Sequence, residues 1–225
     1  MDVPAAICET ADFKMAVPAR VGERGAATRA QLDQMLFFRV GDDLVSFPVA
    51  YAPVVPVPAR IGCVLDTREL SFTFWASDMA PPDADMLRPV SFFDTPPVGS
   101  GRPAGDFLVT VTRLYYGAHA NWLNTSTTIG HMRRNGTPRG MLYGLENFSS
   151  GPYQFLIRLS EDCTVLVQFS NSTEWADRPA SMNFQNSAWS AGALVRARFA
   201  DRWDAVYNAI DAFVAKHMVK NYFKK

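Results

Sequence analysis

The sequence predicts an all-β fold, an antiparallel β-sandwich or barrel within a chain of 225 residues. Apolar and polar residues alternate with a period of two in many short segments, and these segments are rich in β-branched and aromatic residues. Gly, Pro, Asn, Asp or Ser bounds each segment, and little helical pattern lies between them, which favours antiparallel strands over a parallel sheet. A β-sandwich or barrel of this length usually forms one domain.

The composition predicts an ordered core, and the balanced charge does not indicate a charged partner such as nucleic acid. Hydrophobic residues make up 48% of the chain and charged residues 20%, which excludes disorder over most of its length. Lys and Arg together number 22, as do Asp and Glu. The chain as a whole therefore has no net field that would attract nucleic acid or an anionic membrane.

The beginning of the chain predicts an extended arm followed by a short helix. Residues 1–20 have no sustained periodicity and lack the basic start and apolar core of a secretory signal, so we expect synthesis in the cytoplasm. Thr28 can cap a helix over residues 26–36, in which Leu32 and Met35 share one face. We therefore expect an arm over 1–20, a β-domain over 21–200 and a C-terminal helix over 201–225.

Ten segments have the strand pattern, and three long connections separate them. The predicted strands are 36–40, 43–51, 61–65, 69–75, 107–116, 118–128, 140–145, 153–159, 163–169 and 193–199. The predicted long loops are 78–106, 129–139 and 174–190, which are rich in Pro or Gly. Loops of this length in a compact domain usually form contact surfaces, so they point to partners.

The final segment has helical spacing. Trp203, Val206, Tyr207 and Ile210 follow the i, i+3, i+4, i+7 pattern, while lysines gather near the end of the chain. This pattern predicts an amphipathic helix packed on the β-domain or on a neighbour. A basic tail that touches nucleic acid or a membrane is the alternative.

The cysteines predict neither a disulfide framework nor a zinc site. Cys8, Cys63 and Cys163 are odd in number, far apart and without a CxxC pair. We expect them to be buried thiols.

No residue pattern predicts catalysis, a cofactor or a metal. The stretch "GSGRPA" at 99–104 matches a dinucleotide-binding fingerprint, but a strand and not a helix is expected after it. No pair among His119, His131 and His217 has metal-ligand spacing, and Glu161 and Asp162 are neighbours on a predicted turn. Arg133, Arg134 and Arg139 form a small basic loop whose expected role is surface solvation. The sequence therefore predicts a protein that is not an enzyme.

Four stretches resemble coat proteins of picorna-like viruses, and one of them, 153–169, is similar to a pair of core strands of that family. "VGERGAATRAQLDQML" at 21–36 is similar to a family stretch in which a Gly-Glu pair leads into a short helix. The segment 107–127 resembles an aromatic run that ends in a Gly turn, and 194–207 resembles a closing strand with an acidic signature after it. The positions that carry this resemblance are Gly22, Glu23, Arg29, Leu32, Tyr115, Tyr116, Gly117 and Asp201.

The resemblance implies an eight-stranded antiparallel jelly-roll β-sandwich with short helices and a C-terminal helix. It implies a structural capsid subunit that assembles with sister coat proteins into an icosahedral shell around RNA. The implied partners are other capsid subunits, the encapsidated RNA only indirectly and a host receptor, with no membrane span. The implied location is the virion, and the host cytoplasm during assembly.

Two other functions stay open at this stage. One is a carbohydrate- or protein-binding β-sandwich module without catalytic activity, in which exposed aromatic residues such as Trp175 and Trp189 would stack on sugars. The other is an enzyme on a β-barrel scaffold, for which His119 and Asp162 are the residues to mutate.

Overall fold

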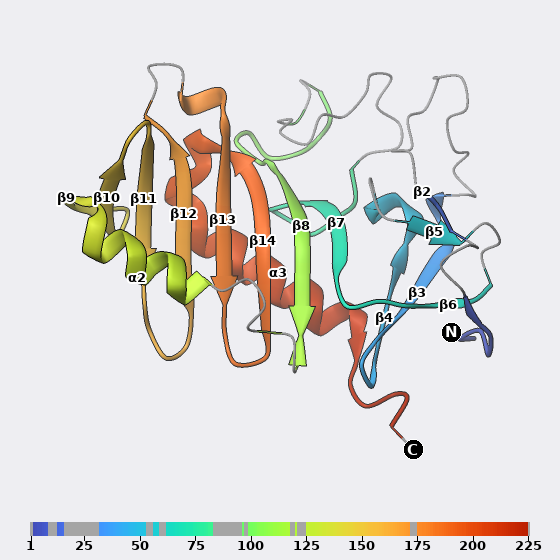
Figure 1. The fold of residues 1–225 in the computed structure, drawn as a ribbon. Coiled ribbons are helices and arrows are strands. Elements are labelled where there is room, and N and C mark those ends of the chain that lie inside the picture. The colour runs from blue at the N-terminus through green and yellow to red at the C-terminus, as the bar shows by residue number, and fades with distance from the viewer. Residues whose placement is uncertain are drawn as a thin grey trace. The chain divides into compact units, whose positions relative to one another are not determined.

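The computed structural model divides the chain into two compact units. Unit 1 comprises Met1–Leu108 and Ala209–Lys225, and unit 2 comprises Val109–Asn208. Figure 1 shows the elements of both units. The structure describes residues 2–8, 13–15, 32–52, 56–58, 62–82, 96, 99–117, 120, 125–171 and 175–224.

Unit 2 is built on an antiparallel sheet with the strand order β8-β14-β13-β12-β11-β10-β9. From β9 to β14, each strand pairs with the next strand of the chain, and β14 then pairs with β8. Strands β9 to β14 therefore form a meander, and β8, which precedes them in the chain, pairs with β14. Its strands are β8 (Leu108–Tyr116), β9 (Thr137–Leu142), β10 (Leu145–Ser150), β11 (Tyr153–Arg158), β12 (Thr164–Ser170), β13 (Pro179–Gln185) and β14 (Trp189–Arg196).

Both faces of the unit 2 sheet carry apolar side chains. On one face, Phe155 and Ile157 pack with Ile129 and Met132 of helix α2 (Thr125–Asn135). On the other face, Phe184 and Trp189 pack against Tyr207, which lies near the start of helix α3 (Trp203–His217). Figure 1 shows α2 and α3 on opposite sides of these strands. Because both faces of the sheet are covered, its strands carry apolar residues on both sides. They are therefore more hydrophobic than strands that have one face in water.

Unit 1 contains a mixed sheet with the order β1-β6-β3-β4-β15. β3 (Met35–Val40) and β4 (Asp43–Pro48) form an antiparallel hairpin, while β6 (Val64–Asp66) is parallel to both β1 (Ile7–Cys8) and β3. β15 (Met218–Val219), from the end of the chain, pairs antiparallel with β4. The other strands are β7 (Leu70–Trp75) and the antiparallel pair β2 (Phe13–Met15) and β5 (Pro56–Pro58).

Aromatic rings fill the core of unit 1. Phe213 of α3 stacks on Phe72 with a ring separation of 4.1 Å and lies 5.8 Å from Phe47. His217, one turn later, contacts the rings of Phe213 and Tyr51. Residues near the end of the chain therefore pack with aromatic residues of its first half in one core.

The prediction of a mostly β protein is confirmed, but the jelly-roll arrangement is not. A jelly roll joins its strands through Greek-key connections that pair strands distant in the chain. In unit 2, consecutive strands from β9 to β14 are spatial neighbours instead. The alternation of apolar and polar residues predicts where strands lie but not which strands pair.

Several predicted elements are wrong. The predicted strand over 36–40 is confirmed as part of β3, but β3 already begins at Met35, so the helix predicted over 26–36 is wrong at its end, while residues 26–31 lie outside the described part of the chain. The predicted strand over 118–128 and loop over 129–139 are replaced, where the structure describes them, by α2 and the start of β9. The predicted loop over 174–190 contains β13. α3 ends at His217, so the last residues are not helical.

The cysteine prediction is wrong for two of the three residues. Cys8 and Cys63 form a disulfide between Cα atoms 5.4 Å apart. The parallel pairing of β1 with β6 brings these distant residues together, a contact that their spacing in the sequence does not reveal. Cys163 is a buried free thiol, as predicted.

Candidate functional site

The structure describes five of the eight positions that suggested a viral coat protein. Gly22, Glu23 and Arg29 lie outside the described residues. Leu32 belongs to unit 1 and is 1% exposed. In unit 2, Tyr115 and Tyr116 are buried residues of β8, the N–H of Gly117 donates to the carbonyl of Ala188, and Asp201 is exposed. These residues have packing and turn roles.

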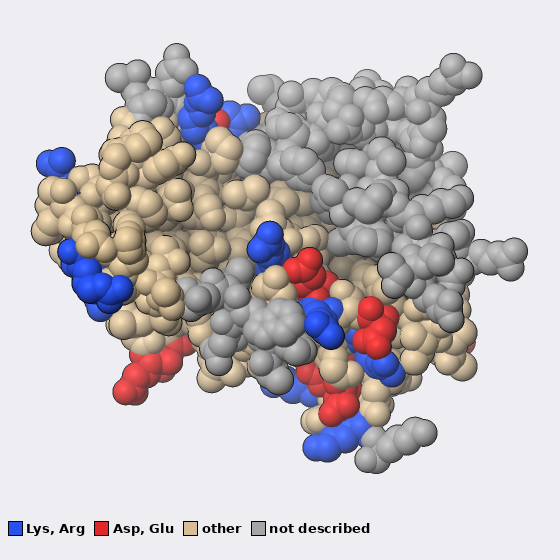
Figure 2. All heavy atoms as spheres, viewed as in Figure 1, with Lys and Arg blue, Asp and Glu red and all other residues tan. Residues whose placement is uncertain are grey.

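A pocket of about 210 Å³ lies in unit 2 and is the candidate site. The pocket lies on the sheet face opposite α2, because Gln154 and Phe169 are cross-strand partners there, while Phe155 points to α2. Figures 1 and 2 show the α2 face, which is the face opposite the pocket. Most of the unit 2 surface on this face is neither acidic nor basic. The lining residues are Leu142, Tyr143, Gln154, Phe169, Ser170, Asn171 and Trp175.

Tyr143 is held in an uncommon backbone conformation at one side of the pocket. It has φ +54° and Gly144 has φ +76°, so the two residues form a tight turn between β9 and β10. Asn-Gly is the preferred pair for such a turn, and a bulky side chain with positive φ is strained. The carbonyl of Tyr143 accepts a hydrogen bond of 3.0 Å from the indole of Trp203. This bond fixes a strained tyrosine at the rim of the pocket.

Two further rings form the other side of the pocket. Trp175 begins the short 3-10 turn η4 (Trp175–Asp177), and its ring lies 5.4 Å from that of Phe169 on β12. Trp175 is half-buried, so part of its ring surface is open to a ligand. Trp189, in contrast, is 1% exposed and packs on Tyr207, so the expectation that it stacks on sugars is wrong.

The polar lining of the pocket comprises Gln154, Ser170 and Asn171. The amide nitrogen of Gln154 donates a hydrogen bond of 2.9 Å to the side-chain oxygen of buried Asn147. In this arrangement the nitrogen end of the Gln154 amide is turned toward Asn147. The Gln154 amide oxygen is then the atom that can accept a hydrogen bond from a ligand.

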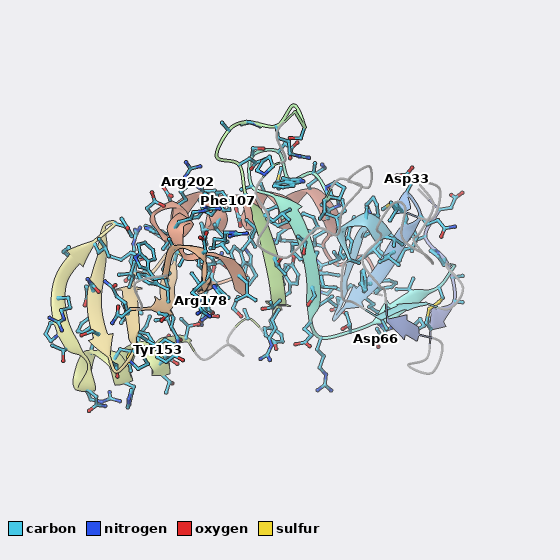
Figure 3. The ribbon with its side chains drawn as sticks, turned by 90° about the horizontal axis from the view of Figure 1, so that it is seen from above. Asp33, Asp66, Phe107, Tyr153, Arg178 and Arg202 are labelled. Carbon is cyan, nitrogen blue, oxygen red and sulfur yellow. A yellow bond between two sulfur atoms is a disulfide. The ribbon has the colours of Figure 1, made fainter. Side chains whose placement is uncertain are left out.

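Arginine side chains of unit 2 pair with an acidic residue and with an aromatic ring. Asp177, two residues after Trp175, accepts a hydrogen bond of 3.0 Å from Arg196 and lies 3.4 Å from Arg198. The guanidinium of Arg158 lies over the ring of Trp203, whose indole donates to the carbonyl of Tyr143. Figure 3 shows the side chains of unit 2, with Arg178 and Arg202 labelled.

Unit 2 uses arginine alone for its positive charge. Residues 109–208 contain no lysine, and all their basic residues other than histidine are Arg113, Arg133, Arg134, Arg139, Arg158, Arg178, Arg196, Arg198 and Arg202. Arginine is enriched and lysine depleted in protein interfaces, because the planar guanidinium pairs with carboxylates and stacks on rings. The composition of unit 2 is therefore typical of an interaction surface.

The edge of the sheet is poorly suited to binding an added strand. β9 pairs with β10 and ends the strand order at this side of the sheet. Pro138 lacks an N–H, Arg139 is charged and exposed, and Gly140 has φ +84° where the register with β10 shifts. Proline, charge and an irregular register are devices that protect edge strands. The pocket is the more favourable contact surface of unit 2.

The titratable groups of the described residues do not form a reactive set. Burial raises the pKa of the Cys163 thiol to about 11, so the thiol stays protonated at neutral pH. Glu161 and Asp162 are exposed on the turn after β11, and His131 is exposed on α2. His119 lies outside the described residues. No group of three His, Cys, Asp or Glu residues in the described ranges is arranged to hold a metal ion.

Comparisons with known proteins show similarity of fold. No family model and no curated protein matches the chain. The fold is similar to that of Smlt3025, an immunity protein of the Stenotrophomonas maltophilia type IV secretion system, with a TM-score of 0.55 and 11% identity. That match covers 84% of this chain and 94% of Smlt3025. A second match, to the iron-regulated outer membrane lipoprotein FrpD of Neisseria meningitidis, has a TM-score of 0.44, 9% identity and coverage of 88% and 99%.

The match to Smlt3025 overturns the predicted relation to picorna-like coat proteins, because the protein with the similar fold is a bacterial immunity protein. The predicted capsid function, the coat-protein, RNA and receptor partners and the virion location are therefore wrong. The physical reason is that an aromatic strand followed by a glycine turn, as at Tyr115–Gly117, occurs in antiparallel sheets of many kinds. In the part of the chain that the structure describes, no helix is long and apolar enough to cross a membrane.

The sequence prediction missed most of the pocket. Trp175 is the one lining residue that the sequence analysis names as a binding residue. The dipeptide Tyr143-Gly144 between two apolar segments was the available signal, because glycine there indicates a tight hairpin turn. Gln154 and Phe169 have no such signal, since only the strand register makes them neighbours.

Proposed function

We propose that this chain is a non-catalytic module that binds another protein. The observation that carries the proposal is the pocket lined by Tyr143, Phe169 and Trp175, in a unit whose basic residues other than histidine are all arginine. Aromatic residues and arginine are the residue types that dominate binding energy in protein interfaces. The fold shared with Smlt3025, itself an immunity protein, adds support for a role of this class.

The absence of catalysis is part of the proposal and is supported by the chemistry of the described side chains. A nucleophile needs a nearby base, and the buried Cys163 has a raised pKa that opposes thiolate formation. His217 is buried among aromatic rings and bonds the carbonyl of Ser46. Neither group lies in the pocket.

A carbohydrate-binding function is the second candidate. Trp175 offers a half-buried ring, and Gln154 and Asn171 offer amides, a combination that can stack on a sugar and bond its hydroxyl groups. The arginines of unit 2 favour the protein partner, because neutral sugars have no charge for them to pair with.

The proposal is tested with the full chain and the proteins encoded beside it. Each is purified, mixed with the chain and analysed by size-exclusion chromatography with light scattering. We expect one of them to form a complex of fixed stoichiometry that survives re-injection. If each neighbouring protein elutes apart from the chain and a glycan array gives strong signals, the protein-binding proposal is wrong and the carbohydrate candidate replaces it.

A further inference from the structure

We propose that the disulfide between Cys8 and Cys63 is a redox latch, which closes in an oxidising compartment and then fixes residues 2–8 to the sheet of unit 1. In a reducing compartment the two cysteines are thiols, and the segment is released while the rest of the chain stays folded. The latch lies in unit 1, so this inference does not depend on the pocket of unit 2. It implies that the chain acts outside a reducing cytoplasm.

The first segment of the chain is weakly attached apart from the disulfide. Cys8 is the one buried residue among residues 2–8, and Ile7 is 50% exposed. The strand β1 has two residues, and the carbonyl of Ala6 before it accepts a hydrogen bond of 2.8 Å from the N–H of Val64. Burial of apolar surface offsets the entropy that a chain loses when it is ordered, and this segment buries little. The covalent link is therefore what holds the segment in place.

The disulfide can be reached by an attacking thiol. Exchange requires a thiolate to approach one sulfur atom of the disulfide, so at least one of the cysteines must be accessible. Cys63 is partly exposed, and no described atom lies within 4 Å of the place that a Cβ would take at Gly62. Cys8 becomes accessible when the segment frays, because terminal segments open at little cost. Reduction therefore does not require unit 1 to unfold.

The third cysteine is kept out of this exchange. Cys163 lies in unit 2 and is 8% exposed, and its burial raises the pKa of the thiol to about 11. The thiol is therefore protonated at neutral pH, and a protonated thiol does not attack a disulfide. Of the pairings that the three cysteines allow, the folded chain therefore forms the one between Cys8 and Cys63.

Closing the latch is a two-electron oxidation. The S–H bonds of Cys8 and Cys63 break, one S–S bond forms, and two protons and two electrons pass to an oxidant that carries a disulfide of its own. The disulfide of the oxidant becomes two thiols. Compartments outside the cytoplasm supply such thiol oxidants, whereas glutathione and thioredoxin keep cytoplasmic thiols reduced.

The latch also changes the cover of an apolar cluster. Val3 packs against a buried cluster of the unit 1 sheet, which consists of Phe37, Leu44 and Val64. Phe223, near the end of the chain, packs against the same cluster without a covalent link. Release of residues 2–8 removes Val3 from the cluster and leaves Phe223 in place. The released form should therefore stay folded and expose more apolar surface.

Hydrogen exchange of the full chain, oxidised and reduced, tests the latch. The reporter is the N–H of Val64, whose acceptor is the carbonyl of Ala6. We expect this N–H to exchange at least about ten-fold faster in the reduced chain, while the amides of β11 and β12 keep their rates. Equal protection of Val64 in both forms would overturn the proposal. Complete loss of protection in β3, β4 and β7 would also overturn it, because the disulfide would then be required for the whole fold of unit 1.

Cysteine variants separate the latch from a general effect of the reductant. Cys8→Ser cannot form the disulfide, so the N–H of Val64 should exchange fast under oxidising and reducing conditions alike. Cys163→Ser is the matched control and should keep the dependence on redox state, because this cysteine is a free thiol in the folded chain. If exchange in Cys8→Ser still slowed under oxidising conditions, the disulfide would not be the cause and the proposal would be wrong.

Thiol labelling in bacterial cells tests the compartment. The full chain is produced with and without an added secretory signal, the cells are quenched with acid, and the denatured chain is labelled with a maleimide of known mass. The exported chain should carry one label, at Cys163, and the chain kept in the cytoplasm should carry three. An exported chain with every cysteine labelled, or a cytoplasmic chain with Cys163 alone labelled, would overturn the proposal.

Discussion

The two units achieve stability in different ways. Unit 2 is one continuous stretch of chain, and most of its strands pair with their neighbours in sequence. Unit 1 combines Met1–Leu108 with Ala209–Lys225, so its sheet and aromatic core need segments from both ends of the chain. Local pairing costs little loop-closure entropy, whereas contacts between distant segments cost more. Unit 1 should therefore depend on a few strong long-range contacts.

Removing the central aromatic ring of unit 1 should have the largest effect. Phe213 is 1% exposed and contacts Phe47, Phe72 and Phe74. Phe213→Ala should lower the free energy of unfolding by about 4 kcal/mol, because it leaves a cavity in a packed core. Urea denaturation measures this change, with exposed Tyr222→Ala as the control. A loss no greater than that of the control would show that the aromatic cluster is not the main support of unit 1.

Removing the disulfide should have the next largest effect. Cys8 and Cys63 are separated by 55 residues, and linking them restricts the unfolded chain. The Cys8→Ser, Cys63→Ser double variant should lose about 3 kcal/mol. Hydrogen exchange should quicken in β1, β3 and β6 and stay unchanged in β11 and β12. Cys163→Ala is the control for loss of a cysteine, and equal acceleration in both units would contradict the proposed difference between them.

Acidification should weaken unit 1 through a buried histidine. Burial lowers the pKa of His217, and the neighbouring charge of Lys216 lowers it further, while the bond to the Ser46 carbonyl opposes both. That carbonyl can only accept, so Nδ1 carries the proton, and buried Nε2 has no partner among the described residues. A second proton would place a charge at Nε2 without an acceptor.

The sign of the pH effect follows from this lowered pKa. Between the folded-state pKa and the unfolded value of about 6.5, the unfolded chain binds more protons. Stability should therefore be complete above about pH 6.5 and fall as the pH drops through that window. Urea denaturation from pH 7.5 to 5 measures the slope, which should decrease in His217→Phe. His131→Gln, at an exposed position on α2, should retain the slope.

The same difference between the units explains what the sequence could predict. In unit 2, the strands at 153–158 and 164–170 follow from alternation and turn residues, which are local signals. In unit 1, the pairing of Cys8 with Cys63 and the packing of Phe213 on Phe72 join distant residues. Such contacts leave no local pattern, and so the cysteine prediction failed there.

Local signals also failed where tertiary packing competed with them. Thr125–Asn135 contains threonines and a glycine that are weak helix formers, but Ile129 and Met132 gain burial against Phe148 and Phe155 as α2. The pocket was not predictable for a related reason. Its residues come from the β9–β10 turn, β11, β12 and η4, and only the sheet register brings them together.

Relaxing the strained turn of unit 2 should have the smallest effect on stability. Tyr143→Asn creates the Asn-Gly pair that this turn prefers, so the variant should gain up to about 1 kcal/mol in free energy of unfolding. Loss of the Tyr143 ring from the pocket should at the same time weaken binding of a partner protein there. Thermal denaturation measures the first change and NMR titration the second.

The two measurements on Tyr143→Asn distinguish strain kept for binding from strain without a role. A variant that is more stable and binds more weakly shows that unit 2 retains an unfavourable turn because the tyrosine contacts the partner. A less stable variant would instead show that contacts of the Tyr143 ring outweigh its backbone strain. In that case the turn supports the fold of unit 2, as Phe213 supports that of unit 1, and the strain would give no indication of a binding role.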